Sequence, residues 1–165
     1  MTILGIDPGI ANTGWGVIDI QGQKFRPVSY GTVKTQPSER LEERIAKIAE
    51  DVAEIATAYK VDCVSMEDIF FNRNVSSAIG VAKVIGAICH SMFQKGISVT
   101  VYTPMQFKLA VTGYGMAEKA QVQEMTRIIL GLEKIPRPNH AADALAAAVC
   151  HANMSATQSR MAEKK

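Results

Sequence analysis

The chain has 165 residues, enough for one domain with a buried core. Hydrophobic residues make up 47% of the sequence and charged residues 21%, which excludes intrinsic disorder for most of its length. Eighteen basic and sixteen acidic residues leave a net charge of +2, so charge alone does not indicate a nucleic-acid partner.

Three strands joined by short turns are expected in the first part of the chain. An apolar run over residues 3–7 is followed by the turn Asp7-Pro8-Gly9, and two further strands are predicted over residues 14–20 and 25–34. Because the links between them are short and contain turn residues, we expect an antiparallel three-strand meander.

A long amphipathic helix is predicted next, with Pro37 and Ser38 at its start and Ser38 as the cap. Its apolar residues recur at steps of four and three: Leu41, Ile45, Ile48, Val52 and Ile55. The buried run at residues 61–66 reads as a strand that follows this crossover helix, so it should run parallel to an earlier strand.

Four more helices and one more strand are expected in the second half. The strand covers residues 99–102, and the helices run from about Ser76 to Gln94, from Thr103 (capping-box spacing) to Gly113, over residues 117–130, and from Asn139, its cap, to about Ala152. This order, β-β-β-α-β-α-β-α-α-α, predicts an α/β fold with a mixed five-stranded sheet flanked by helices. We expect one domain of residues 1–152 and a disordered C-terminal tail of residues 153–165.

The cysteines and the N-terminus indicate a compartment. Cys63, Cys89 and Cys150 are far apart and odd in number, which argues for packed free thiols in a reducing environment. The first residues lack a basic segment, and no apolar run approaches the roughly 18–20 residues of a membrane span. We therefore predict a cytoplasmic protein that has no membrane partner.

Four polar side chains form the candidate site. Asp7 and Glu67 each follow an apolar strand, so parallel neighbours would bring both carboxylates to one edge of the sheet. His140 and Asp143 are three residues apart on the last predicted helix and share a face. Oxygen ligands with one nitrogen suit Mg²⁺ or Mn²⁺, and two such ions would form a clamp for phosphoryl transfer.

Each of these residues also has an ordinary structural explanation. Asp7 belongs to a common turn signature, and Glu67 could be a solvated strand end. His140 is placed as a surface residue near a helix start would be, and Asp143 in a first turn is favoured by the helix dipole. Only the order and spacing of the four together raise the case for a site.

Several motifs, taken together, resemble the RuvC family of Holliday junction resolvases, members of the RNase H-like nuclease and integrase superfamily. The resemblance extends from Ile3 to about His151. It rests on these segments: Gly5-Ile6-Asp7-Pro8-Gly9, Thr13-Gly14-Trp15-Gly16, Glu67–Asn74, Pro104–Lys108, Gly113-Tyr114-Gly115 with Glu118-Lys119, and His140–Ala144.

The resemblance implies an RNase H-like fold and a homodimeric, structure-specific endonuclease that resolves four-way junction DNA in recombinational repair. Asp7, Glu67, His140 and Asp143 match the four catalytic metal-binding positions of the family, although many members have aspartate where this chain has His140. Mg²⁺ or Mn²⁺, two ions per site, would hydrolyse the phosphodiester to 5′-phosphate and 3′-hydroxyl ends. The branch-migration proteins RuvA and RuvB are implied as partners.

Contacts with DNA are expected at four positions. Lys108 and Lys119 match basic positions that the family uses near the scissile phosphate, and Arg73 lies beside the catalytic loop. Phe70 matches an aromatic position from which a ring could stack on an unpaired base. The weaker candidates are Lys83 and Arg137, and the hydrophobic neighbour Phe71 is expected to anchor its loop.

The predicted helix over residues 76–94 is the candidate dimer interface. It contains small residues that permit close approach of two backbones: Ala78, Gly80, Ala82, Gly86 and Ala87. An isologous two-fold contact is the usual arrangement for a homodimer. The alternative is that these small residues pack on the protein's own sheet.

Three rival functions stay open. The segment from Asp7 to Gly14 also resembles the phosphate-binding turn of actin-like and sugar-kinase ATPases, but 165 residues hold only one lobe and no second such turn is present. A different RNase H-like nuclease would act on RNA–DNA hybrids or replication ends. A structure-specific DNA-binding protein would bind junctions without cleaving them.

Overall fold

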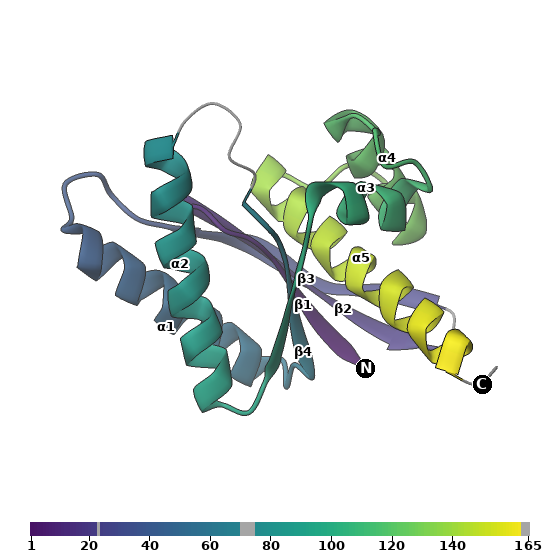
Figure 1. Cartoon of the computed structure of the whole chain (residues 1–165), viewed down its shortest axis with the longest axis horizontal. Helices are drawn as coiled ribbons and strands as arrows, with labels where there is room; N and C mark the ends of the chain where they lie inside the picture. The colour runs from purple at the N-terminus through teal and green to yellow at the C-terminus, as the bar shows by residue number, and fades with distance from the viewer. Residues whose placement is uncertain (23, 70–74, 163–165) are drawn as a thin grey trace.

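A mixed five-stranded sheet with helices on both faces forms the fold, seen in a computed structural model that describes residues 1–22, 24–69 and 75–162 (Figure 1). The elements follow the predicted order: β1 (Thr2–Asp7), β2 (Asn12–Gln21), β3 (Lys24–Lys34), α1 (Leu41–Ala58), β4 (Cys63–Glu67), α2 (Val75–Gln94), β5 (Ser98–Tyr102), α3 (Pro104–Thr112), α4 (Lys119–Ile129) and α5 (Asn139–Ala162). No helix within the described ranges is long and apolar enough to cross a membrane.

The strands lie in the order β3-β2-β1-β4-β5. The pairs β1–β2 and β2–β3 are antiparallel, which confirms the predicted meander, and β4 runs parallel to both β1 and β5. Ile6 pairs with Met66 in the parallel ladder, so the next residues, Asp7 and Glu67, leave the sheet side by side at its carboxyl edge.

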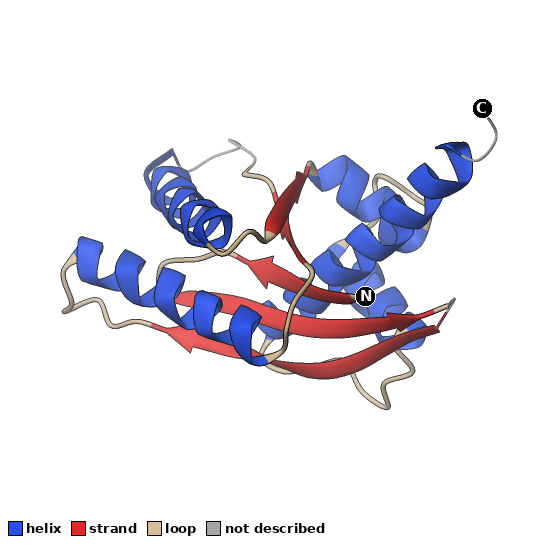
Figure 2. Ribbon diagram, turned by 90° about the horizontal axis from the view of Figure 1, so that it is seen from below, coloured by secondary structure: helices blue, strands red, loops and turns tan. Residues whose placement is uncertain are grey.

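The two faces of the sheet carry separate hydrophobic cores, because alternate residues of a strand point to opposite sides. Leu4 and Ile6 of β1 pack with residues of α1 and α2 on one face. Ile3 packs on the other face with residues of α3, α4 and α5. Figure 2 shows the sheet between these two helical layers. Burial on both faces explains why β1 and β4 read as nearly continuous apolar runs.

Helix α5 lies directly against the middle of the sheet, and glycine makes this approach possible. A Cβ placed on Gly5 of β1 would overlap the carbonyl oxygen of Ala144, and one placed on Gly14 of β2 would overlap that of His140. The helix contributes small side chains in return, including the fully buried Ala144 and Ala148. This close contact fixes the start of α5 beside the carboxyl ends of the strands.

The helix ends differ in part from the predicted ones. The capping box of α3 is confirmed, since the Gln106 amide donates to Thr103 Oγ1 (3.3 Å) and the Thr103 amide donates to Gln106 Oε1 (3.0 Å). The predicted Ser38 cap of α1 is wrong, because a turn at residues 36–39 delays the helix to Leu41. The predicted Asn139 cap is also wrong, since α5 already begins at Asn139, whose Oδ1 accepts from Arg137 (2.5 Å).

Helix α5 also continues to Ala162, ten residues beyond the predicted end at Ala152. The extension contains alanine, methionine and glutamine but no glycine or proline, so nothing in its sequence ends a helix. Its beginning is attached to the domain, because Asn153 Nδ2 donates to the carbonyl oxygen of Ala110 (2.8 Å). The division into a domain of residues 1–152 and a tail of residues 153–165 stays a prediction.

Candidate active site

A cavity of about 330 Å³ lies at the carboxyl edge of β1 and β4. Three carboxylates, one imidazole, two lysines and two apolar side chains line it: Asp7, Glu67, Asp143, His140, Lys108, Lys119, Phe107 and Val122. All four predicted metal-site residues and both predicted lysines are therefore brought to one place, although they come from five different elements.

Each acidic residue reaches the cavity for a reason that the fold supplies. Asp7 and Glu67 are the last residues of parallel strands, and both point to the α5 face because they share parity with Ile3 and Cys63, which pack there. His140 and Asp143 lie in the first turn and a half of α5, which the glycine contacts hold against β1 and β2.

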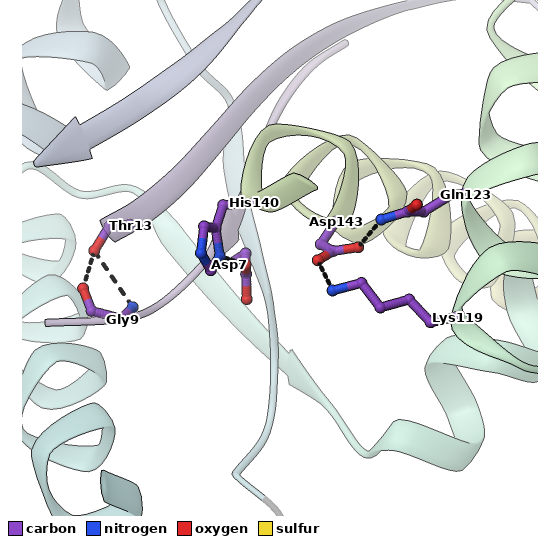
Figure 3. A network of polar contacts seen from close by, with 7 residues as sticks. All are labelled: Asp7, Gly9, Thr13, Lys119, Gln123, His140 and Asp143. Carbon is purple, nitrogen blue, oxygen red and sulfur yellow. Dashed lines mark hydrogen bonds and ion pairs between the residues drawn. The ribbon is translucent and has the colours of Figure 1, made fainter. Parts of the chain in front are cut away.

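Asp7 and His140 are joined by a hydrogen bond. His140 Nδ1 donates to Asp7 Oδ2 over 2.7 Å (Figure 3). Burial raises the pKa of Asp7, the hydrogen bond from His140 lowers it, and the charge of Asp143 adds to the increase. The imidazole thus orients a carboxylate that the environment makes more basic than usual.

Glu67 carries the larger shift. The pKa of its carboxyl group is raised from 4.5 to about 6, chiefly by burial and in addition by the negative charges of Asp7 and Asp143, while Lys108 and Lys119 oppose the shift. Because only two lysines face the three carboxylates, the cavity keeps a net negative charge when all three are ionised. A site of this kind favours an additional cation.

Asp143 is held from α4 at both of its oxygens (Figure 3). Lys119 Nζ donates to Oδ2 over 2.5 Å, and Gln123 Nε2 donates to Oδ1 over 2.9 Å. Gln123 was not among the site residues predicted from the sequence. The available signal was its place on α4, where it is a polar residue beside Val122 and Thr126 on the buried stripe of the helix.

The donor set fits Mg²⁺ or Mn²⁺, since it offers carboxylate oxygens and one imidazole nitrogen around an undercompensated negative charge. Within the described part of the chain, however, no three His, Cys, Asp or Glu side chains already stand in the arrangement of a bound ion. The contacts explain why, because Asp7 is paired with His140 and Asp143 with Lys119 and Gln123.

Glu67→Gln is expected to stabilise the metal-free protein at pH 8 but not at pH 4. The folded-state pKa of Glu67 is raised, so the stability that its protonated form gives is present below pH 4.5 and is lost as the pH rises through about 6. A shift from 4.5 to about 6 corresponds to at most about 2 kcal/mol, and partial exposure of the side chain reduces that figure. Urea unfolding with a chelator present measures the difference. An equal gain at both pH values would contradict the argument.

The weaker predicted DNA contacts, Lys83 and Arg137, do not line this cavity. Phe70 and Arg73, together with the predicted loop anchor Phe71, lie outside the described residues. Lys83 is exposed on α2, on the other face of the sheet, and the Arg137 side chain donates to Asn139. Cys63 and Cys150 are buried and Cys89 is partly buried, all as free thiols, as predicted.

Known proteins of one family match this chain over most of its length. The family model described as "Crossover junction endodeoxyribonuclease RuvC" matches residues 3–151. A protein of that name from Desulforamulus reducens is 44% identical over 157 residues, which are 95% of this chain and 96% of the relative. Another from Brevibacillus brevis is 46% identical over 156 residues, 94% of each chain.

Solved structures agree with the sequence matches. Thermus thermophilus RuvC in complex with a Holliday junction substrate matches with a TM-score of 0.90 at 40% identity, over 96% of both chains. The yeast mitochondrial Holliday junction resolvase Ydc2 matches with a TM-score of 0.65 at 13% identity, over 93% of this chain and 80% of that one, which is a likeness of fold alone. The predicted fold class, RNase H-like α/β with a mixed five-stranded sheet, is confirmed.

Proposed function

This chain belongs to the RuvC family of crossover junction endodeoxyribonucleases, and from that premise we propose that it resolves Holliday junctions by symmetric, metal-dependent hydrolysis of two strands of like polarity in recombinational DNA repair. The observation that supports the proposal most is the cavity itself. Three carboxylates and an imidazole from β1, β4 and α5 line one cavity together with two lysines at the carboxyl ends of the strands.

Asp7, Glu67, His140 and Asp143 are the residues that would hold the metal. Two ions of Mg²⁺ or Mn²⁺ per site, when bound, supply an activated water and stabilise the leaving 3′ oxygen, which gives 5′-phosphate and 3′-hydroxyl ends. The chain's own contribution is to concentrate negative charge at a fixed place. Burial makes the carboxyl groups of Asp7 and Glu67 more basic, and the His140 contact orients Asp7.

Lys108 and Lys119 are the groups that would bind the scissile phosphate. Both line the cavity from the α3–α4 side, opposite the strand ends that carry Asp7 and Glu67. An ammonium group attracts a phosphate as a point charge, and its flexible stem lets it follow the phosphate during cleavage. Phe70 would stack on an unpaired base at the crossover and Arg73 would contact the backbone beside the site.

We propose a homodimer that forms through the outer face of α2. Ile79 and Phe93 on this face are 48% and 81% exposed, and Gly86, seven residues from each, has nothing within 4 Å of where a Cβ would lie. Residues seven apart lie on one face of a helix, so these three form a seam that a second copy could cover closely. Ala78 and Gly80 do not belong to it, because both are buried, with Gly80 against Ile10.

Phe93→Glu is expected to convert the dimer to a monomer and to replace paired nicks by single, uncoordinated ones. In an isologous contact the substitution places a charge on each side of the same interface. Sedimentation at micromolar concentration measures the state of association. Ile128→Glu, at an exposed apolar position of α4, is the matched control and should leave the dimer intact. A Phe93→Glu protein that sediments as a dimer would refute this interface.

Two further proposals complete the assignment. The branch-migration proteins RuvA and RuvB are partners of this protein by its family membership. The protein works in the cytoplasm, which its three free thiols support.

One experiment separates the proposed function from its rivals. A four-way junction, a linear duplex and an RNA–DNA hybrid are incubated with the protein and Mg²⁺ or Mn²⁺. We expect paired, symmetric nicks in the junction alone. Cleavage of the hybrid would instead indicate another RNase H-like nuclease, and junction binding without cleavage a DNA-binding protein. ATP turnover without cleavage would favour the kinase-like alternative.

A further inference from the structure

Two residues of helix α4, one turn apart, donate hydrogen bonds to the two carboxylate oxygens of Asp143. Lys119 donates to Oδ2 and Gln123 donates to Oδ1, and the two donors are four residues apart on the same helical face (Figure 3). The carboxylate side chain of Asp143 is 18% exposed, so these contacts replace much of its hydration. Asp143 therefore depends on α4 for its orientation as well as on its own helix α5.

The two donors differ in how firmly they are held. Gln123 is 9% exposed and belongs, with Val122 and Thr126, to the buried face of α4. Its side-chain amide therefore has little freedom to move away from Asp143. The Lys119 side chain is 63% exposed, and its ammonium group is carried on a flexible chain of four carbons. An exposed ion pair of this kind is weak and is readily exchanged. One contact is thus fixed and the other is replaceable.

We propose that Gln123 is a positioning residue that fixes Oδ1 of Asp143, and that Lys119 holds the place of the metal ion at Oδ2 and is displaced when a divalent cation binds. The proposal rests on the proposed function, because it concerns how the same site accepts its metal. It also explains why the described carboxylates are not already grouped around an ion, since a lysine of the chain neutralises one of them.

The exchange follows from charge and from chemistry. A carboxylate can accept from the Gln123 amide at one oxygen and bind a cation at the other, whereas Oδ2 cannot keep a close ammonium contact beside a divalent ion. Residues that orient a metal ligand in this way are worth about 10–100-fold in metal affinity or activity. Displacement also frees the Lys119 ammonium for a phosphate, so binding of metal and of DNA should strengthen one another reciprocally.

Calorimetric titration of the full-length, DNA-free protein with Mn²⁺ tests both halves, because the two substitutions should act in opposite directions. Gln123→Met keeps the size of the side chain and removes the donor, and we expect Mn²⁺ affinity to fall about 10-fold or more. Lys119→Met removes the competing ammonium, and we expect Mn²⁺ affinity to rise several-fold. Thermal melting of each variant checks that it folds. If Gln123→Met does not fold, Gln123→Leu replaces it in the titration.

Two matched controls isolate the contacts. Gln121 lies on the same helix, and its Oε1 accepts a hydrogen bond from the backbone amide of Glu118 but makes none with Asp143. Gln121→Met removes that bond and should leave Mn²⁺ affinity within about twofold. Lys108→Met removes a cavity lysine that is not paired with Asp143. It therefore measures how much Mn²⁺ affinity changes when the cavity loses one positive charge but Asp143 keeps both of its contacts. The gain with Lys119→Met should exceed the gain with Lys108→Met.

Either of two results would overturn the proposal. Mn²⁺ affinity of a folded Gln123 variant within twofold of the wild-type value would remove the positioning role. A gain with Lys119→Met no larger than with Lys108→Met would remove the exchange. Failure of the proposed function is seen separately, as a wild-type protein that binds Mn²⁺ but cleaves no junction, and the titration is unaffected by that outcome.

Discussion

Asp7→Asn is expected to reduce the rate of junction cleavage at least 100-fold while the protein still binds the junction. The amide keeps the shape of the carboxylate but removes its charge, and a group that orients a metal ligand is already worth about 10–100-fold, so loss of a ligand itself should cost no less. The substitution also removes one of the three carboxylate charges of the cavity, so the remaining site attracts a cation less strongly. Single-turnover cleavage and a gel-shift titration measure the two quantities.

Asp51→Asn is the matched control for this substitution. Asp51 lies on α1, where it pairs with Lys47 at the surface, so the same chemical change should leave cleavage within about twofold. If Asp7→Asn cleaved as well as this control, Asp7 would not be a metal ligand. If it lost junction binding as well, its role would be in DNA contact or in folding.

Gly5→Ala is expected to lower the free energy of unfolding by about 3 kcal/mol or more and to abolish cleavage. The new methyl group would overlap the carbonyl oxygen of Ala144 on α5, which is backbone and cannot turn aside, so the helix must move away from β1. Overpacking of a core typically costs about 1–3 kcal/mol, and a backbone obstacle lies at the upper end. Movement of α5 would carry His140 and Asp143 away from Asp7. Equilibrium urea unfolding and junction cleavage measure both effects.

Gly115→Ala is the control for a glycine without such an obstacle. A Cβ there would meet Met105 Cγ at 3.1 Å, and this flexible side chain, unlike a backbone carbonyl, can shift by the small distance required. We expect the free energy of unfolding to change by less than about 1 kcal/mol. A Gly5→Ala protein as stable as this control would show that α5 does not depend on glycine for its position.

Much of the fold follows from patterns that act over short distances. The acids Asp7 and Glu67 end apolar runs, and the Thr103 capping box and Gly113 mark the limits of α3, so these features were predictable from neighbouring residues. The end of α5 was not, because the prediction relied on the loss of an apolar stripe, while helix propensity continues to Ala162.

Features that depend on contacts distant in sequence were missed. Gln123 has no motif of its own, and its role is visible only when α4 lies beside Asp143, twenty residues further along the chain. The value of Gly5 and Gly14 likewise appears only once α5 is placed on the sheet, more than a hundred residues after both. The four metal-site candidates were found because their chemistry is unusual where they occur, and the residues that support them are chemically ordinary.

Strand β1 supplies alternate side chains to two unlike surroundings, Leu4 and Ile6 to an apolar layer and Gly5 and Asp7 to the helix and the cavity. Insertion or deletion of one residue within Thr2–Asp7 would exchange those surroundings. The charged Asp7 would then point into the apolar layer, and a bulky aliphatic side chain would point against α5. Evolution and protein engineering can therefore vary which aliphatic residues this strand carries, but they have almost no freedom to change how many residues it contains.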